Sequence, residues 1–183
     1  TSPGGDPAVT VQRARLELHK TASAKPVGSD LYATAAFPAG SGPDFVNAVV
    51  ALQTDLAPLG LLAALHSIEA EAGRARVERW GQRTLDLDML ALGDAVLPDL
   101  NTFSWWRDMP LEQQLQVAPK ELILPHPRLQ ERGFVLVPLA QIAPDWTHPV
   151  LGQTAAKLCA GLPAEQRADV RRIGPPVLTP QIP

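Results

Sequence analysis

The sequence predicts an α+β fold with an antiparallel sheet, and three observations lead to that fold class. Segments with helical periodicity alternate with strand-like segments in the first half of the chain. The composition is that of a folded protein, since 45% of the 183 residues are hydrophobic and 19% are charged. Most of the 19 prolines follow Leu97, so the second half should be richer in loops. We therefore expect one domain over residues 1–162 and a C-terminal tail over 163–183.

Two helices are predicted in the first half. Asp6-Pro7 is a typical helix start, an N-cap residue followed by proline, and it predicts a helix over residues 7–19. Pro58 opens a second helix whose apolar residues recur at steps of three and four, and Gly73 should end it.

Three regions are typical of strands. Residues 25–37 are short of helix formers, residues 45–54 are rich in β-branched residues, and residues 84–92 alternate apolar with polar side chains up to a Gly93-Asp94 turn. The order helix, strand, strand, helix, strand is that of a ferredoxin-like fold without its first strand. We therefore expect a ferredoxin-like α/β sandwich with an antiparallel sheet, whose first strand would precede Thr1.

The second half gives weaker patterns. Leu111 to Ala118 predicts a short polar helix, and Gln153 to Leu162 predicts a final one. Phe134 to Ile142 is an apolar run whose periodicity permits either a helix or a strand.

Charge and cysteine content exclude several classes of protein. The formal net charge is −3, from 16 basic and 19 acidic residues, which does not suit a broad basic face for nucleic acid. The uncharged run from Leu56 to Ile68 is well below the ~20 residues that cross a bilayer. A single cysteine, Cys159, excludes an internal disulfide framework. We expect a cytoplasmic protein without a nucleic-acid or membrane partner.

Asp86 and Asp88 are the most specific candidate site residues. Two residues apart on a strand, their side chains point the same way and are separated by about 6.6 Å along the chain. Two carboxylates at this spacing suit Mg²⁺, which commonly takes one or two carboxylates plus substrate phosphates. A half-exposed strand with two solvated aspartates is the alternative.

The segment before this pair is basic. Residues 73–83 hold four arginines and one glutamate, and guanidinium groups bind phosphate through a planar fork of donors. A basic segment next to an acidic pair is typical of a site for a magnesium-bound polyphosphate. A solvated charged loop would have the same composition. Further along, His126 stands between prolines and is followed by Arg132 and Phe134, although a turn histidine and a core phenylalanine would look alike.

Three segments resemble one family. The run Arg79-Trp-Gly-Gln-Arg-Thr-Leu-Asp-Leu-Asp88 resembles the signature of the 6-hydroxymethyl-7,8-dihydropterin pyrophosphokinase family of folate biosynthesis. Leu124-Pro-His126 with the run from Arg132 to Pro144 resembles a second block of that family, and the run from Phe45 to Leu52 resembles its substrate-side strand. The resemblance covers residues 6–149.

The resemblance implies an enzyme, a 2-amino-4-hydroxy-6-hydroxymethyldihydropteridine diphosphokinase, that is a monomer or homodimer. It would transfer pyrophosphate from ATP to the hydroxymethyl group of 6-hydroxymethyl-7,8-dihydropterin and release AMP. The resemblance implies that Asp86 and Asp88 bind two Mg²⁺ ions and are catalytic together with Arg74 and Arg76. ATP would be bound by Glu69, Arg76, Trp80, Arg83, His126 and Arg132. The pterin would be bound by Thr34, Phe45, Asn47, Trp80 and Phe134.

The chain departs from the family in three places. The family's first strand, with its glycine-containing turn, does not appear in this sequence. Ala35-Ala36 replaces the proline pair that many members carry. Residues 99–121 form an insert relative to compact members and carry Trp105 and Trp106.

Two other functions use similar features. A magnesium-dependent nucleotidyltransferase also carries an aspartate pair on a strand, but it transfers a nucleoside monophosphate. A non-catalytic ferredoxin-like binding module would tolerate the loss of both aspartates.

Overall fold

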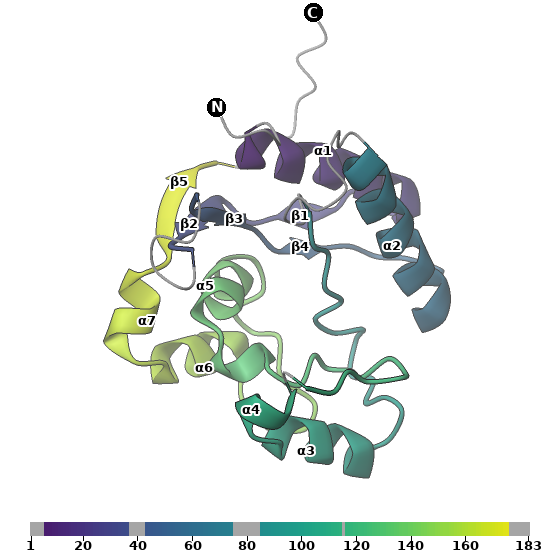
Figure 1. Cartoon of the computed structure of the whole chain (residues 1–183), viewed down its shortest axis with the longest axis vertical. Coiled ribbons are helices and arrows are strands. Elements are labelled where there is room, and N and C mark those ends of the chain that lie inside the picture. Colours follow the sequence, from purple (N-terminus) through teal and green to yellow (C-terminus); the bar gives the residue numbers. More distant parts are fainter. Residues whose placement is uncertain (1–5, 37–42, 75–84, 115, 176–183) are drawn as a thin grey trace, which may run out of the picture.

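The computed structural model describes residues 6–36, 43–74, 85–114 and 116–175, and these residues form an α+β fold (Figure 1). The helices are α1 (Pro7–Leu18), α2 (Pro58–Arg74), α3 (Leu100–Asp108), α4 (Leu111–Gln114), α5 (Gly133–Ile142), α6 (Ala155–Gly161) and α7 (Ala164–Ala168). The strands are β1 (Val27–Gly28), β2 (Leu31–Thr34), β3 (Phe45–Asn47), β4 (Val50–Ala51) and β5 (Arg171–Gly174). Single-turn 3₁₀ helices span His19–Thr21 and Leu129–Glu131.

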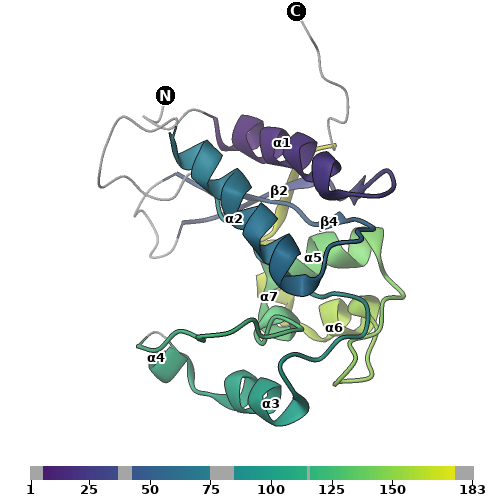
Figure 2. The ribbon, with the colours of Figure 1, turned by 90° about the vertical axis from the view of Figure 1, so that its right-hand side faces the viewer.

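The strands form two small antiparallel sheets. β1 pairs with β4, and a three-stranded sheet has the order β3-β2-β5. Helices α1 and α2 lie on one side of the strands, and α5 and α6 lie on the other (Figures 1 and 2). The predicted strand regions 25–37 and 45–54 are thus confirmed, each divided into two short strands.

The two predicted helices of the first half are also confirmed. The Asp6 side chain accepts a hydrogen bond from the Ala8 N–H at 2.8 Å, which is the capping contact that its position predicts. Helix α2 continues one residue beyond Gly73. Their apolar faces pack together in a core that contains Leu18, Leu61 and Leu65.

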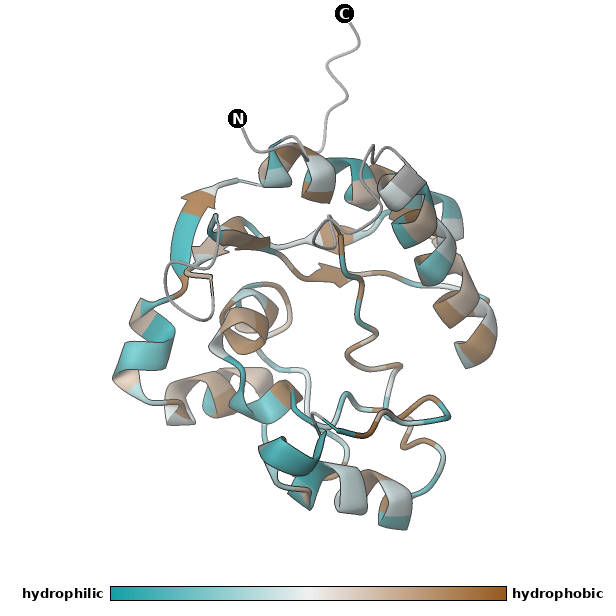
Figure 3. Cartoon of the chain, in the orientation of Figure 1, coloured by the Kyte–Doolittle hydropathy of each residue, from teal (hydrophilic) through white to brown (hydrophobic). Residues whose placement is uncertain are grey.

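A second core lies on the other face of the strands. The run from Phe134 to Ile142, which the sequence left open between helix and strand, is helix α5, and it is largely apolar (Figure 3). Its Leu136 and Leu139 pack with Val49 and with Leu158 of α6. A side chain at Gly133 would place its Cβ 2.6 Å from the Gln166 carbonyl oxygen, so only glycine lets α5 begin this close to α7.

Residues 99–121, the predicted insert, contain a helix, α3, that the sequence analysis missed. The Asp99 carboxylate accepts a hydrogen bond from the Thr102 N–H at 3.0 Å, and this cap is a signal that could have located the helix. Phe103 and Trp106 are buried with Ile123 in a small core of their own. The helix predicted from Leu111 to Ala118 is present as the shorter α4 (Figure 3).

The end of the chain also contains elements that were not predicted. Helix α7 and strand β5 follow residue 162, and β5 pairs with β2. The Asp30 carboxylate accepts hydrogen bonds from Arg172 Nε of β5 at 2.5 Å and from Gln141 Nε2 of α5 at 2.7 Å. Asp30 therefore joins the C-terminal strand and α5 to the start of β2.

The prediction of a paired strand over residues 84–92 is wrong. Thr84 lies outside the described residues, and residues 85–92 have no assigned strand and no ladder partner within the described part of the chain. The predicted alternation is nevertheless present, since Asp86 and Asp88 are exposed whereas Met89 is buried. A strand requires a neighbour that pairs with its backbone, and alternation in the sequence does not supply one.

No helix among the described residues is long and apolar enough to pass through a bilayer.

Candidate active site

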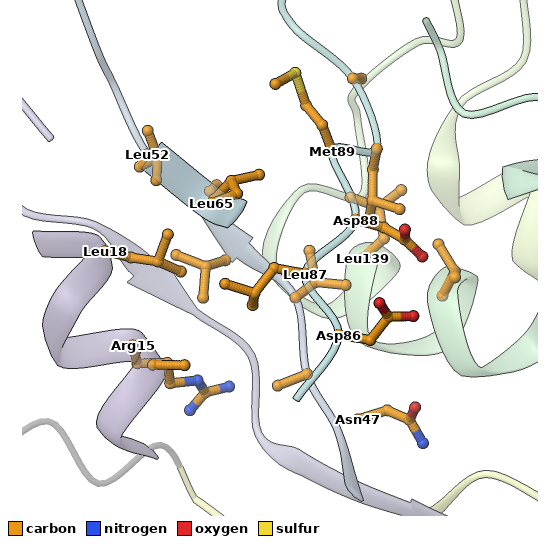
Figure 4. A pocket seen from close by; sticks show the side chains of 18 of the residues that line it. Arg15, Leu18, Asn47, Leu52, Leu65, Asp86, Leu87, Asp88, Met89 and Leu139 are labelled. Atoms are coloured by element: carbon orange, nitrogen blue, oxygen red, sulfur yellow. The ribbon is translucent and has the colours of Figure 1, made fainter. Parts of the chain in front are cut away.

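A cavity of about 480 Å³ lies between helices α1 and α2, residues 46–52 and residues 85–93 (Figure 4). Most of its lining is apolar, from residues such as Leu18 and Leu65. Four of the predicted site residues also line it, namely Asn47, Asp86, Asp88 and Phe134. The structure therefore brings the acidic pair, one predicted pterin contact and one predicted aromatic wall to the same cavity.

Asp86 and Asp88 direct their carboxylates to the same side of their segment, and Leu87 points to the opposite side (Figure 4). Leu87 packs against the core that contains Leu18 and Leu65. The paired orientation of the two carboxylates that the spacing predicts is therefore present without a sheet.

The hydrogen bonds that join this segment to its surroundings include one at Leu87 and one at Leu90. The Leu87 N–H donates to Glu69 Oε1 of α2 at 2.7 Å, and the His126 N–H donates to the Leu90 carbonyl at 2.8 Å. Glu69, which the resemblance assigns to ATP, thus contacts the backbone between the two aspartates. No local pattern in the sequence indicates this contact, because the partners are 18 positions apart.

Two basic residues, His126 and Arg132, interact electrostatically with Asp88. Burial lowers the pKa of His126, the positive charge of Arg132 lowers it further, and the negative charge of Asp88 opposes both. Burial also lowers the pKa of Arg132, and Asp88 again opposes the shift. The negative charge of Asp88 therefore raises the pKa of both basic groups, so the three residues interact electrostatically.

The hydrogen bonding of His126 defines the tautomer of its neutral ring. Its Nδ1 accepts a hydrogen bond from the Arg128 N–H at 3.1 Å, so the proton of the neutral ring is on Nε2. Arg128 is held in turn by an ion pair with Glu131. His126 therefore presents an N–H donor at Nε2, which suits an oxygen acceptor.

The other predicted pterin contacts gather on β2 and β3. Thr34 is paired with Phe45 in the antiparallel register, and Asn47 Nδ2 donates to Thr34 Oγ1 at 2.9 Å. Phe45 is 54% exposed and Phe134 is 38% exposed, so both residues are accessible. The Arg132 guanidinium lies 5.6 Å from the centroid of the Phe134 ring, a cation–π contact that the sequence did not reveal.

Four predicted site residues have no described side chain. Arg76, Trp80 and Arg83 lie outside the described residues, and Arg74 ends α2 without a described side chain. Their roles stay predictions.

Arg15 of α1 is a residue of the cavity that sequence analysis missed. It is 4% exposed, and its Nη2 donates to the Ser29 carbonyl at 2.5 Å. Its Nε and Nη1 atoms have no hydrogen-bond partner among the described residues, and the guanidinium lies at the cavity (Figure 4). Burial lowers the pKa of Arg15, and the charge of Asp30 opposes this shift. An arginine on a helix carries no sequence signal of burial.

The donor set at the aspartate pair suits a hard cation that keeps part of its shell from elsewhere. No group of three or more His, Cys, Asp or Glu side chains that could hold a metal occurs among the described residues. Two exposed carboxylates fit Mg²⁺, because this ion commonly binds through one or two carboxylates and takes its other ligands from water and substrate phosphates.

Comparisons with known proteins point to one family. Residues 2–144 match the profile of the family described as 7,8-dihydro-6-hydroxymethylpterin-pyrophosphokinase (HPPK). A 2-amino-4-hydroxy-6-hydroxymethyldihydropteridine pyrophosphokinase of Synechocystis is 44% identical over 116 residues, which are 63% of this chain and 49% of the relative. The enzyme of the same name from Pseudomonas aeruginosa is 43% identical over 137 residues, covering 75% of this chain and 72% of the relative. That of Methylorubrum extorquens is 42% identical over 118 residues, 64% of this chain and 61% of the relative. The matched part thus spans about half of the Synechocystis relative and more of the other two.

Proposed function

The chain belongs to the 7,8-dihydro-6-hydroxymethylpterin-pyrophosphokinase family, and on that premise we propose that it transfers pyrophosphate from ATP to the hydroxymethyl group of 6-hydroxymethyl-7,8-dihydropterin. The hydroxyl oxygen would bond to the β-phosphorus of ATP and lose its proton to solvent, and the bond from that phosphorus to the bridging oxygen of the α-phosphate would break. The products are AMP and the pterin diphosphate. The observation that carries the proposal is the aspartate pair, oriented to one side and facing the charge of His126 and Arg132.

Asp86 and Asp88 would hold Mg²⁺, two ions by resemblance to the family. When bound, Mg²⁺ neutralises the charge of the phosphate oxygens and brings the reacting groups together. The two aspartates would hold the positive charge of the metal at one end of the cavity. Their exposure supports the assignment, because the phosphates of a substrate must reach the same ions.

His126 and Arg132 would contact the phosphates of ATP. Arg132 is cationic at neutral pH and offers a planar set of donors to phosphate oxygens. His126 stays neutral, because its pKa is lowered, and donates from Nε2. The neutral ring adds a hydrogen bond without a second positive charge beside Arg132.

The pterin would bind at the β2–β3 end of the site. Phe45 and Phe134 offer exposed rings that can stack on a flat heterocycle. The Asn47 amide, held by Thr34, offers an oxygen and a nitrogen to the hydrogen-bonding edge of the pterin. Arg74, Arg76, Trp80 and Arg83 are assigned by resemblance alone, as an additional set of contacts to the phosphates and the pterin.

We extend the proposal to the fold. An additional strand between β3 and residues 85–92 would complete a ferredoxin-like sheet, with α1 and α2 over one face. Three features support it: β3 is an edge strand, residues 85–92 lack a ladder partner among the described residues, and the cavity lies between these two segments. Such a strand would pair backbone groups on both sides and fill the apolar part of the cavity.

Product analysis tests the activity. The full-length protein is incubated with Mg²⁺, ATP and 6-hydroxymethyl-7,8-dihydropterin, and the nucleotides are separated by chromatography. We expect AMP and the pterin diphosphate in equal amounts, and no AMP when the pterin is omitted.

Other products would assign a different function. ADP would indicate an ordinary kinase, free pyrophosphate would indicate a nucleotidyltransferase, and binding without turnover would indicate a non-catalytic module. Each of these outcomes contradicts the proposal.

A further inference from the structure

The C-terminal segment formed by α7 and β5 contacts the chain directly before each aromatic residue of the proposed pterin site, Phe45 and Phe134. This segment, residues 164–174, follows the part of the chain that the family profile matches, which ends at residue 144. β5 pairs with β2 on the side opposite to β3 (Figure 1). The segment therefore lies beside the strand that carries Thr34.

The first contact is an ion pair at the residue before Phe45. Arg171 Nη2 of β5 donates to Asp44 Oδ2 at 2.6 Å. In the sheet, Arg171 is paired with Ala33 of β2, and Thr34 is paired with Phe45 of β3. The Arg171 side chain therefore crosses β2 and joins β5 to the start of β3.

The second contact is a close approach at the residue before Phe134. Gly133 begins α5, and a Cβ at this position would lie 2.6 Å from the Gln166 carbonyl oxygen and 3.4 Å from Val170 Cγ2. Val170 is buried, and it directly precedes Arg171. The start of α5, which carries Phe134, is therefore packed against the same segment that holds Asp44.

These contacts bear on the separation of the two aromatic residues. A flat ligand that stacks between two rings requires them at a definite distance, and a small misplacement of a binding group is costly. Phe45 belongs to the sheet and Phe134 to a helix, so their separation depends on how these elements are joined. Both residues are exposed, so they have little packing of their own to fix it.

We propose that Arg171 is a positioning residue, which acts through Asp44 to hold Phe45 at the separation from Phe134 that a pterin requires. This inference deepens the proposed function and rests on it, since the pterin is the substrate. An exposed ion pair contributes little to the stability of a whole protein, so the expected effect is on pterin binding rather than on folding.

The first test is a charge-reversal cycle in the full-length protein. Arg171→Glu and Asp44→Arg each place like charges together, whereas the double variant restores an ion pair with reversed polarity. We expect each single variant to raise KM for the pterin by about 5- to 10-fold, with kcat and KM for ATP changed by less than about twofold. The double variant should return to within about twofold of the wild type. Arg167→Glu, the same charge change at an exposed arginine of α7, is the matched control.

The second test does not depend on turnover. Amide hydrogen exchange of residues 45–47 is measured without ligand, with amides of α2 as the internal reference. We expect exchange at least about threefold faster in Arg171→Glu and in Asp44→Arg, and wild-type exchange in the double variant and in Arg167→Glu. If a single reversal does not fold, Arg171→Gln removes the charge alone and should raise KM for the pterin by about 2- to 5-fold.

The outcomes are distinct. A loss of pterin affinity that the double variant does not reverse, or equal rises in KM for the pterin and for ATP, would overturn the positioning role. Unchanged exchange of residues 45–47 in both single variants would overturn it as well. A folded wild type that forms no AMP, with the expected exchange pattern, would contradict the proposed function and leave the coupling of β5 to β3 established.

Discussion

The sequence predicts strands over residues 45–54 and 84–92, yet only the first region contains paired strands among the described residues. β3 and β4 have antiparallel partners in β2 and β1, whereas residues 85–92 have the alternation of a strand without its ladder. The difference shows that alternation in the sequence predicts the direction of side chains. Pairing also requires a neighbouring strand, which alternation does not predict. The carboxylates proposed to bind metal are on the segment with less backbone support.

The two segments should therefore respond differently to substitution. Asn47 on β3 is fixed by a ladder and by the Thr34 side chain, so changing it should affect one substrate contact. Residues 85–92 carry both proposed metal ligands, so changes there should affect the chemistry as a whole.

The largest effect is expected at the aspartate pair. Asp86→Asn and Asp88→Asn should each lower kcat by at least about 10³-fold, because a metal ligand stabilises the transition state by several kcal/mol. Folding should not change, since both side chains are exposed. Steady-state rates and thermal unfolding measure the two effects, with Asp94→Asn in the following turn as the control. Near-normal Mg²⁺-dependent rates in either folded variant would show that the pair does not bind the metal.

A smaller and more selective effect is expected on the paired segment. Asn47→Ala should raise KM for the pterin by about 3- to 10-fold, the value of one neutral hydrogen bond, and should leave KM for ATP unchanged. Asn101→Ala, an exposed asparagine of α3, is the matched control. An equal rise in both KM values would mean that Asn47 supports the site as a whole.

The smallest effect concerns how the free energy of unfolding depends on pH through His126, whose N–H donates to the Leu90 carbonyl. The pKa of His126 is lowered by burial and by Arg132, so below pH about 6.5 the unfolded chain takes up a proton that the folded chain does not. The free energy of unfolding should fall between pH 7 and pH 5, by at most about 1.4 kcal/mol per pH unit from this residue. Urea unfolding of His126→Asn should show a weaker fall than the wild type. An unchanged slope would contradict the buried neutral state of His126.

His148 is a second buried histidine with a lowered pKa, and it lies away from the candidate site. It is fully buried between the rings of Phe103 and Trp146, and burial lowers its pKa as well. His148→Asn should likewise weaken the pH dependence of unfolding, but it should leave the apparent Mg²⁺ affinity unchanged, because His148 belongs to the core beside the insert.

Local signals predicted much of the fold. Asp6-Pro7 placed the start of α1, and the spacing of apolar residues placed α2, because capping and periodicity depend on near neighbours in the chain. Helix α3 was missed although Asp99 caps it, since the surrounding residues have little apolar periodicity. Strand β5 depends on pairing with β2, a partner about 140 residues away that no local pattern reveals.

The geometry of the candidate site was predicted only in part. The spacing of Asp86 and Asp88 was enough to predict two carboxylates on one side, because the alternation of an extended chain is a local property. The bond from Leu87 to Glu69 and the stacking of Arg132 on Phe134 are tertiary contacts. Burial of Arg15 is of the same kind, because it depends on how α1 packs against residues 28–30.

Binding of a non-cleavable nucleotide tests the role of the aspartate pair most directly. Calorimetric titration of the full-length protein with α,β-methylene-ATP, with and without Mg²⁺, separates metal-dependent from metal-independent binding. We expect Mg²⁺ to tighten binding to the wild type, and the double variant Asp86→Asn/Asp88→Asn to bind at least about tenfold more weakly with no response to Mg²⁺. A folded double variant with the same response to Mg²⁺ as the wild type would contradict the assignment of these carboxylates to the metal.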